Sequence, residues 1–280
     1  MKSFFTKERI RAIISFVFAF FVSLGIFCSA LSVGILYFIK ENNLTTCIKN
    51  SNYTKLAVEC LTEELNELAI PSGLDEDFFN GKIDTAEFEN IFYGNLESTL
   101  AKSGEYTVNL DNFKNMVETT VREYTEQATT ELSDETKKDI VSFADACGSI
   151  YLTYINPALL SYALEIFVSV NNYVVMVLFA SLVLTVICAL LLFKLNHLGA
   201  FLQYLFSAFL GASFSLGIIP AFLLLTNEMS KIGITLKSLH AVITALANNF
   251  LTVSVVISLV LATISLILVG IKIFGLIFKK

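Results

Sequence analysis

The 280-residue chain has few charged side chains. Asp, Glu, Lys and Arg make up 16% of it, whereas soluble domains contain about 25%. Hydrophobic residues make up 55% of the chain, and its mean hydropathy is +0.70. This composition excludes a soluble enzyme.

The chain also lacks the patterns on which most catalytic and metal sites depend. Its only histidines are His197 and His240, and no Cys and His spacing typical of zinc occurs. The phosphate-binding patterns GxGxxG and GxxxxGKS/T and the nucleophile pattern GxSxG are absent. We therefore expect no catalytic residue, no cofactor and no enzymatic activity.

The charges that are present are distributed unevenly. Residues 40–170 contain nine Lys or Arg and 23 Asp or Glu, a net charge of −14, whereas the rest of the chain contains ten and two. Because like charges repel, the acidic segment disfavours nucleic acid and anionic lipid as partners. We interpret it as a solvated surface.

Four runs contain no charged side chain and are long enough to cross a membrane, which takes about 20 apolar residues. They cover residues 12–39, 173–193, 199–226 and 242–271. The first run lacks a small-residue cleavage pattern, so we interpret it as an uncleaved signal anchor. The absence of ionisable residues within the runs argues against an ion or proton pathway.

Basic residues near the ends of these runs predict the orientation of the chain. Lys and Arg favour the cytoplasmic side of short segments, and the residues that apply are Lys2, Lys7, Arg9, Arg11, Lys194, Lys272, Lys279 and Lys280. Segments 1–11, 194–198 and 272–280 are then cytoplasmic, and segments 40–172 and 227–241 face outward. We expect a multi-pass plasma-membrane protein with both termini in the cytoplasm.

The outer segment has the apolar periodicity and the capping residues of helices. The expected elements are a helix through Leu56–Leu68 that ends before Pro71, a helix that starts at Asp84, an extended piece over 106–110, a helix over 111–130 and a helix capped by Ser133. The predicted fold class is an all-α integral membrane protein. It has four transmembrane helices and a mostly helical extracytoplasmic domain between the first and the second.

Residues 149–170 are apolar enough to suggest a fifth span. Asn156-Pro157 interrupts this segment, and Glu165 would lie in lipid. The tyrosines of the segment suit an interfacial or core helix instead. We favour such a helix, leading into the second span.

The acidic stretch from Asp75 to Phe88 allows two interpretations. Its second half resembles the second half of an EF-hand calcium loop, and the ligands in this alternative interpretation would be Glu76, Asn80, Asp84 and Glu87. Phe78 would occupy a ligand position that a benzyl group cannot fill. The favoured interpretation is therefore a helix cap at Asp84 with Glu87 in a capping box, and no metal.

Small residues at four-residue spacing predict close helix packing within the spans. They are Gly25 and Ser29 in the first span and Ser207, Gly211 and Ser215 in the third. A substrate path along these faces is the alternative interpretation.

Three cysteines, Cys47, Cys60 and Cys147, lie in the outer segment. Cys47 and Cys60 could close a disulfide-bonded loop in an oxidising compartment. Because reduced Cys behaves as a small hydrophobic residue, buried free thiols at Cys60 and Cys147 are the other possibility.

The order of one span, a large outer segment and three closely spaced spans is similar in layout to ABC-type permeases of the bacterial cell-division class. The Phe-, Ile-, Asn- and Lys-rich composition, without Trp, resembles four-span membrane proteins of low-GC Gram-positive bacteria. We expect a non-catalytic interaction or sensing component of the cell envelope that contacts the lipid bilayer and an extracytoplasmic or membrane protein partner. A permease-type subunit of a transport or signalling complex is the alternative.

Overall fold

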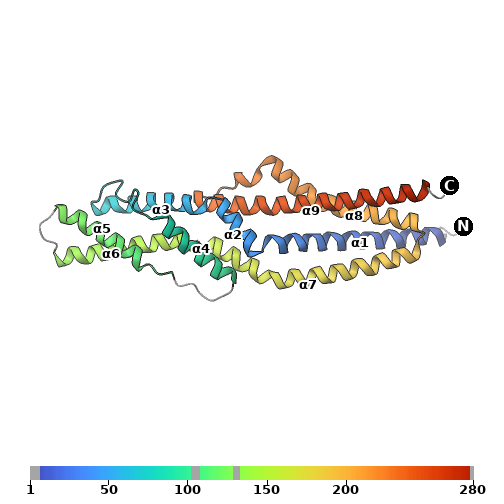
Figure 1. Cartoon of the computed structure of the whole chain (residues 1–280), viewed down its shortest axis with the longest axis horizontal. Coiled ribbons are helices and arrows are strands. Elements are labelled where there is room, and N and C mark those ends of the chain that lie inside the picture. Colours follow the sequence, from blue (N-terminus) through green and yellow to red (C-terminus); the bar gives the residue numbers. More distant parts are fainter. Residues whose placement is uncertain (1–6, 102–107, 129–132, 278–280) are drawn as a thin grey trace, which may run out of the picture. The chain divides into compact units, whose positions relative to one another are not determined.

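The computed structural model describes residues 7–101, 108–128 and 133–277. Throughout these ranges every regular element is a helix and no strand occurs, so the predicted all-helical class is confirmed for them (Figure 1). The terminal residues Lys2, Lys279 and Lys280 lie outside the described residues, as does the beginning of the expected extended piece at Tyr106. The rest of that piece, Val108–Leu110, is irregular and not extended strand.

The chain divides into two compact units. The first contains Met1–Asn43, Ser169–Ile232 and Leu246–Lys280, and the second contains Leu44–Val168 and Gly233–Ala245.

Four helices account for nearly all of the first unit: α1 (Lys7–Phe38), α7 (Ala158–Leu195) from Ser169 onward, α8 (Leu198–Thr226) and α9 (Lys237–Ile277) from Leu246 onward. Each of the four contains a stretch long and apolar enough to cross a membrane. A short 3-10 helix, η2 (Glu228–Lys231), follows α8. These four apolar helices agree with the number expected from the charge-free runs.

Hydroxyl groups and small residues join the helices of the first unit. Ser23 Oγ of α1 donates to the Ala208 carbonyl of α8 at 3.0 Å. Ser29 and Ser181 share a hydrogen bond of 2.8 Å between α1 and α7. In α8 and α9, the hydroxyls of Ser213 and Ser258 each donate to the other residue's carbonyl at 2.9 Å. Such contacts require backbones that approach closely.

The structure places the predicted small residues in different surroundings. A Cβ added at Gly25 would collide with Thr185 of α7, and one added at Gly211 would lie 3.2 Å from Ser23 Oγ. Ser207 and Ser215, however, are exposed.

The buried face of α8 instead runs through Ala208, Ala212 and Leu216, one position further along the chain. This corrects the expectation for Ser207 and Ser215, whereas the close contact expected at Gly211 is present. An apolar helix carries no polar pattern to mark which side is packed, so spacing alone misplaced these two serines.

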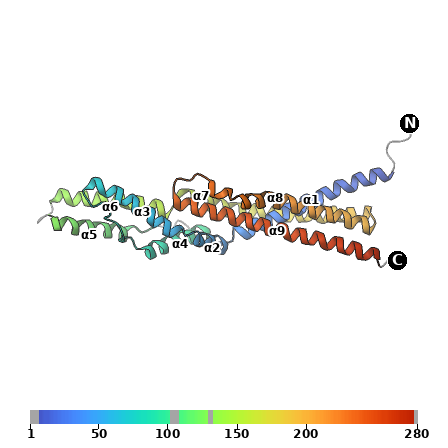
Figure 2. The same cartoon turned by 90° about the horizontal axis from the view of Figure 1, so that it is seen from above.

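The second unit is built around α6 (Asp134–Ile155), which contacts three other helices: α3 (Tyr53–Ala69), α4 (Thr85–Ala101) and α5 (Asp111–Ala128). In both cartoon views α5 and α6 lie side by side (Figures 1 and 2). The 3-10 helix η1 (Ile70–Ser72) follows α3. Helix α2 (Glu41–Asn50), most of which belongs to this unit, was not among the predicted helices.

Aromatic side chains fill much of the core of the second unit. Phe113 of α5 stacks on Tyr151 of α6 with ring centroids 4.1 Å apart, and Phe88 of α4 meets the same ring edge-on. Tyr53 and Phe92 pack at 4.7 Å between α3 and α4. Aromatic pairs in these geometries add about 0.5–1.5 kcal/mol each beyond their buried area.

We expect Gly217→Ala to destabilise the contact between α8 and α9, because the added Cβ would collide with Ser258. Overpacking of this kind costs about 1–3 kcal/mol. Gly270→Ala is the control, since no neighbouring atom lies within 4 Å of an added Cβ there. Loss of helical circular dichroism on heating the detergent-solubilised chain measures both variants. Equal midpoints for the two would contradict the close contact.

Candidate functional site: a cleft where helix α6 ends

Helix α6 ends within the second unit because of Pro157. Proline has no N–H, and it disfavours helical backbone at the residue before it. Accordingly, α6 stops at Ile155, the Asn156 N–H donates to the Leu152 carbonyl at 2.8 Å, and α7 begins at Ala158. This break, anticipated from Asn156-Pro157, leaves the last carbonyls of α6 without helical partners.

Side chains from two other helices satisfy these carbonyls. The Tyr53 hydroxyl of α3 donates to the Tyr154 carbonyl at 2.8 Å in a buried position. The Asn95 amide of α4 donates to the Ile155 carbonyl at 3.5 Å. A buried carbonyl left without a donor costs about 1–3 kcal/mol. The two side chains therefore cap α6 and tie it to α3 and α4.

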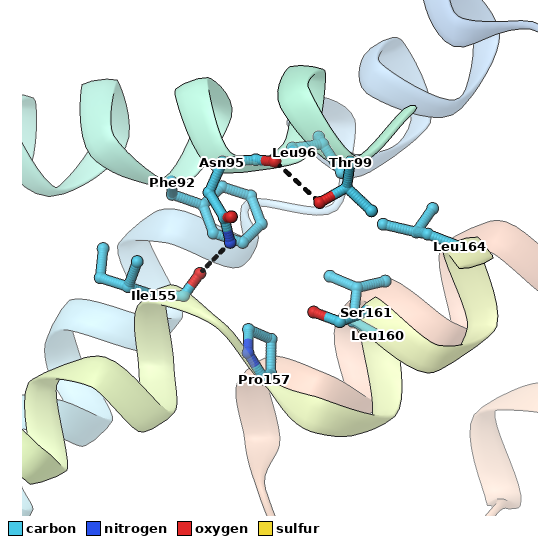
Figure 3. A pocket seen from close by; sticks show the side chains of 9 residues that line it. All are labelled: Phe92, Asn95, Leu96, Thr99, Ile155, Pro157, Leu160, Ser161 and Leu164. Atoms are coloured by element: carbon cyan, nitrogen blue, oxygen red, sulfur yellow. Dashed lines mark hydrogen bonds between the residues drawn. The ribbon is translucent and has the colours of Figure 1, made fainter. Parts of the chain in front are cut away.

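An apolar cleft lies beside this capped end (Figure 3). It contains about 210 Å³ of space, part of which is open to solvent. Helix α4, the end of α6 and the first turns of α7 line it, with the residues Phe92, Asn95, Leu96, Thr99, Ile155, Pro157, Leu160, Ser161 and Leu164. A mostly apolar wall with a few polar groups is the composition of many binding sites, although this cleft is smaller than the roughly 300–1,000 Å³ of small-molecule pockets.

The polar groups of the cleft are engaged with the protein itself. Thr99 Oγ1 donates to the Asn95 carbonyl at 2.9 Å, as Figure 3 shows. The Ser161 hydroxyl donates to the Asn156 side chain across the break. An occupant would consequently be held mainly by apolar contacts, and the limited space of the cleft fits at most the end of an apolar side chain.

The ionisable groups buried near α6 favour their neutral forms. Burial raises the pKa of Tyr53 and of Tyr154, so both phenols stay protonated and able to donate. The Tyr154 hydroxyl donates to Glu64 at 2.8 Å. Burial also raises the pKa of the Cys147 thiol to about 12, which keeps that sulfur from acting as a nucleophile at neutral pH.

The acidic turn before α4 has the geometry of a helix cap. Asp84 Oδ1 accepts from the backbone N–H groups of Ala86 at 2.8 Å and Glu87 at 3.3 Å. The Glu87 carboxylate accepts from the Asn112 side chain at 3.4 Å. Asp84 thus does what capping requires of it.

Asn80 and Glu76, the other two residues of the calcium interpretation, take no part in this helix cap. Asn80 accepts from the Asn66 amide at 3.0 Å, and the Glu76 side chain is exposed. In the described part of the chain, no three His, Cys, Asp or Glu side chains lie close enough together to hold a metal ion. Gly81, at a φ of 72°, supplies the left-handed backbone of the turn.

All five cysteines of the chain are free in the structure. Cys47 and Cys147 are buried, whereas Cys60 is partly exposed. The disulfide considered between Cys47 and Cys60 is therefore absent, and Cys147 lies in the core as a free thiol.

Sequence reasoning identified the break at Asn156-Pro157 but not the cleft beside it. Tyr53 and Asn95 lie 101 and 60 residues from the carbonyls that they cap. No local pattern connects residues so far apart. The only sequence signal was that Tyr53 and Asn95 interrupt the apolar faces of two helices. Because buried polar side chains need hydrogen-bond partners, such residues indicate a contact with another segment.

We predict that Asp84→Ala destabilises the chain by about 0.5–2 kcal/mol, equally with calcium and with chelator, because a cap is lost and not a metal ligand. Glu76→Ala, at an exposed site of the same turn, should have no effect. Thermal unfolding of the solubilised chain measures both. If millimolar calcium raises the unfolding midpoint and Glu87→Ala abolishes that rise, the turn is a calcium site.

Compared with protein-family models, with curated proteins and with solved structures, the chain has no significant match. Its function must therefore be argued from the geometry of its own residues.

Proposed function

We propose that the chain is a multi-pass plasma-membrane protein that acts as a non-catalytic interaction or sensing component of the cell envelope. In this proposal the second unit lies outside the cytoplasm, and both termini lie inside. The observation that carries the proposal is the cleft, because one of its walls belongs to a helix that continues into a candidate span.

Helix α7 contributes both to the wall of the cleft and to a candidate membrane span. Leu160, Ser161 and Leu164 line the cleft from the first two turns of α7, and the helix then runs without interruption to Leu195. A continuous helix is stiff over this length, so an occupant that displaces its first turns acts on the whole element. Sensing through a bound partner follows from this connection.

The distribution of charged residues supports the proposed orientation in the membrane. The net charge of −14 on residues 40–170 disfavours contact with anionic lipid headgroups, which concentrate on the cytoplasmic leaflet. Lys194, in the last turn of α7, fits the cytoplasmic face by the preference of cytoplasmic span ends for positive charge. The second unit is then extracytoplasmic.

The connection between α7 and α8 argues against the permease alternative. Only Asn196 and His197 separate the end of α7 from the start of α8. A subunit that docks a cytoplasmic ATPase needs a coupling helix, and a turn of this length has no room for one. A copurified ATPase would nevertheless favour the permease.

The orientation predicts which positions an impermeant maleimide reaches in intact cells. A cysteine at Ser230, in the short helix after α8, should be labelled, whereas one at His197 should be labelled only after the cells are opened. Both sites are exposed, so access to the side chain is matched. Labelling of His197→Cys alone in intact cells would reverse the topology.

Photo-crosslinking tests the interaction role of the cleft. A benzophenone amino acid at Ser161, inside the cleft, should give a discrete adduct in native membranes, identified by mass spectrometry. The same group at Thr153, exposed on α6 and outside the cleft, should not. Identical adducts at both positions, or none at Ser161, would show that the cleft has no such role.

A further inference from the structure

Three basic residues gather at one end of the first unit. Each borders a charge-free run, because Arg11 precedes the first run, Lys194 follows the second and Lys272 follows the fourth. In both cartoon views the start of α1, the turn between α7 and α8 and the end of α9 occupy the same end of this unit (Figures 1 and 2). We call Arg11, Lys194 and Lys272 the basic end.

Two hydrogen bonds between helices hold the basic end together. Asn196, in the turn between α7 and α8, donates to Ser15 Oγ of α1 at 2.8 Å. Lys272 Nζ of α9 donates to Gln203 Oε1 of α8 at 3.1 Å. Arg11 is four residues, or about 6 Å, from Ser15 along α1, and Gln203 is about 8 Å from the start of α8. Long Lys and Arg side chains near helix ends extend over such steps to the headgroup layer.

The basic end has no counter-ion from the protein. Among the described residues, no ion pair joins Arg11, Lys194 or Lys272 to a carboxylate. At the opposite end of the same unit, by contrast, Lys231 pairs with Glu228 at 2.8 Å. The basic end therefore carries three positive charges whose partners must come from outside the chain.

Membrane phosphates lie at the depth where these charges need acceptors. The hydrocarbon of a bilayer is about 30 Å thick, and a headgroup layer of about 5–8 Å follows it on each side. Residues that border charge-free runs lie at this boundary. An ammonium carries three N–H donors, and the bond to Gln203 uses only one of those on Lys272. Basic groups between transmembrane helices at this depth bind anionic headgroups.

We propose that the basic end binds anionic phospholipid, with lipid phosphate oxygens accepting from Arg11, Lys194 and Lys272. A zwitterionic lipid binds less well, because it brings its own cation next to the basic end and like charges repel. The inference rests on the proposed insertion of the four helices in a membrane. It depends neither on the cleft nor on which side is cytoplasmic.

Native mass spectrometry of the full chain in mild detergent tests this lipid preference by counting bound lipids. The chain should bind phosphatidylglycerol at several-fold lower concentration than phosphatidylcholine with the same acyl chains. Equal binding of the two lipids would overturn this inference alone. Displacement of phosphatidylglycerol by millimolar inorganic phosphate would also overturn it, because a free anion would then suffice. A chain that stays dispersed in buffer without detergent would overturn the membrane insertion as well.

Charge variants locate the lipid on the chain. Lys194→Gln and Lys272→Gln should each weaken phosphatidylglycerol binding about fivefold, the factor that corresponds to about 1 kcal/mol per Lys or Arg near an anionic surface. Lys231→Gln is the matched control, because it removes the same charge where a carboxylate is the partner. Lys194→Arg keeps the charge and should bind like the unmodified chain. Equal weakening by Lys231→Gln, or no weakening by the other two Gln variants, would contradict the proposal.

Discussion

The second unit depends on how α6 ends. Pro157 stops the helix inside the unit, and the hydroxyl of Tyr53 and the amide of Asn95 then satisfy the Tyr154 and Ile155 carbonyls. Without these donors the break would bury unpaired carbonyls at about 1–3 kcal/mol each. The same break lines one wall of the cleft and lets the chain begin α7. The end of the core helix and the cleft therefore have the same local cause.

The first unit is held together by a different interaction. Lipid is as apolar as the side chains of these helices, so burial alone provides little drive for them to associate. Close contacts at Gly25 and Gly211 and the paired hydroxyls of Ser213 and Ser258 provide it instead. The two units therefore obey different rules of packing, as the division of the sequence into acidic and charge-free parts implied.

The sequence allowed prediction of the features that depend on residues close together in the chain. Charge-free runs of about 20 residues mark helices able to span a membrane, and Asp84 and Ser133 mark helix starts because a cap involves neighbours in sequence. Ser207 and Ser215 were wrongly placed on the packed face of α8 because an apolar helix carries no polar pattern that distinguishes its sides. The cleft escaped prediction because Tyr53 and Asn95 meet their partners only in the folded chain.

Hydrogen exchange tests most directly whether the capped end of α6 holds the site together. Tyr53→Phe leaves the Tyr154 carbonyl buried without its donor. Backbone amides in the last turn of α6 and the first turn of α7 should then exchange about tenfold faster or more, while α5 and α8 stay unchanged. Exchange that rises uniformly along the chain, or stays the same around Asn156, would contradict the account.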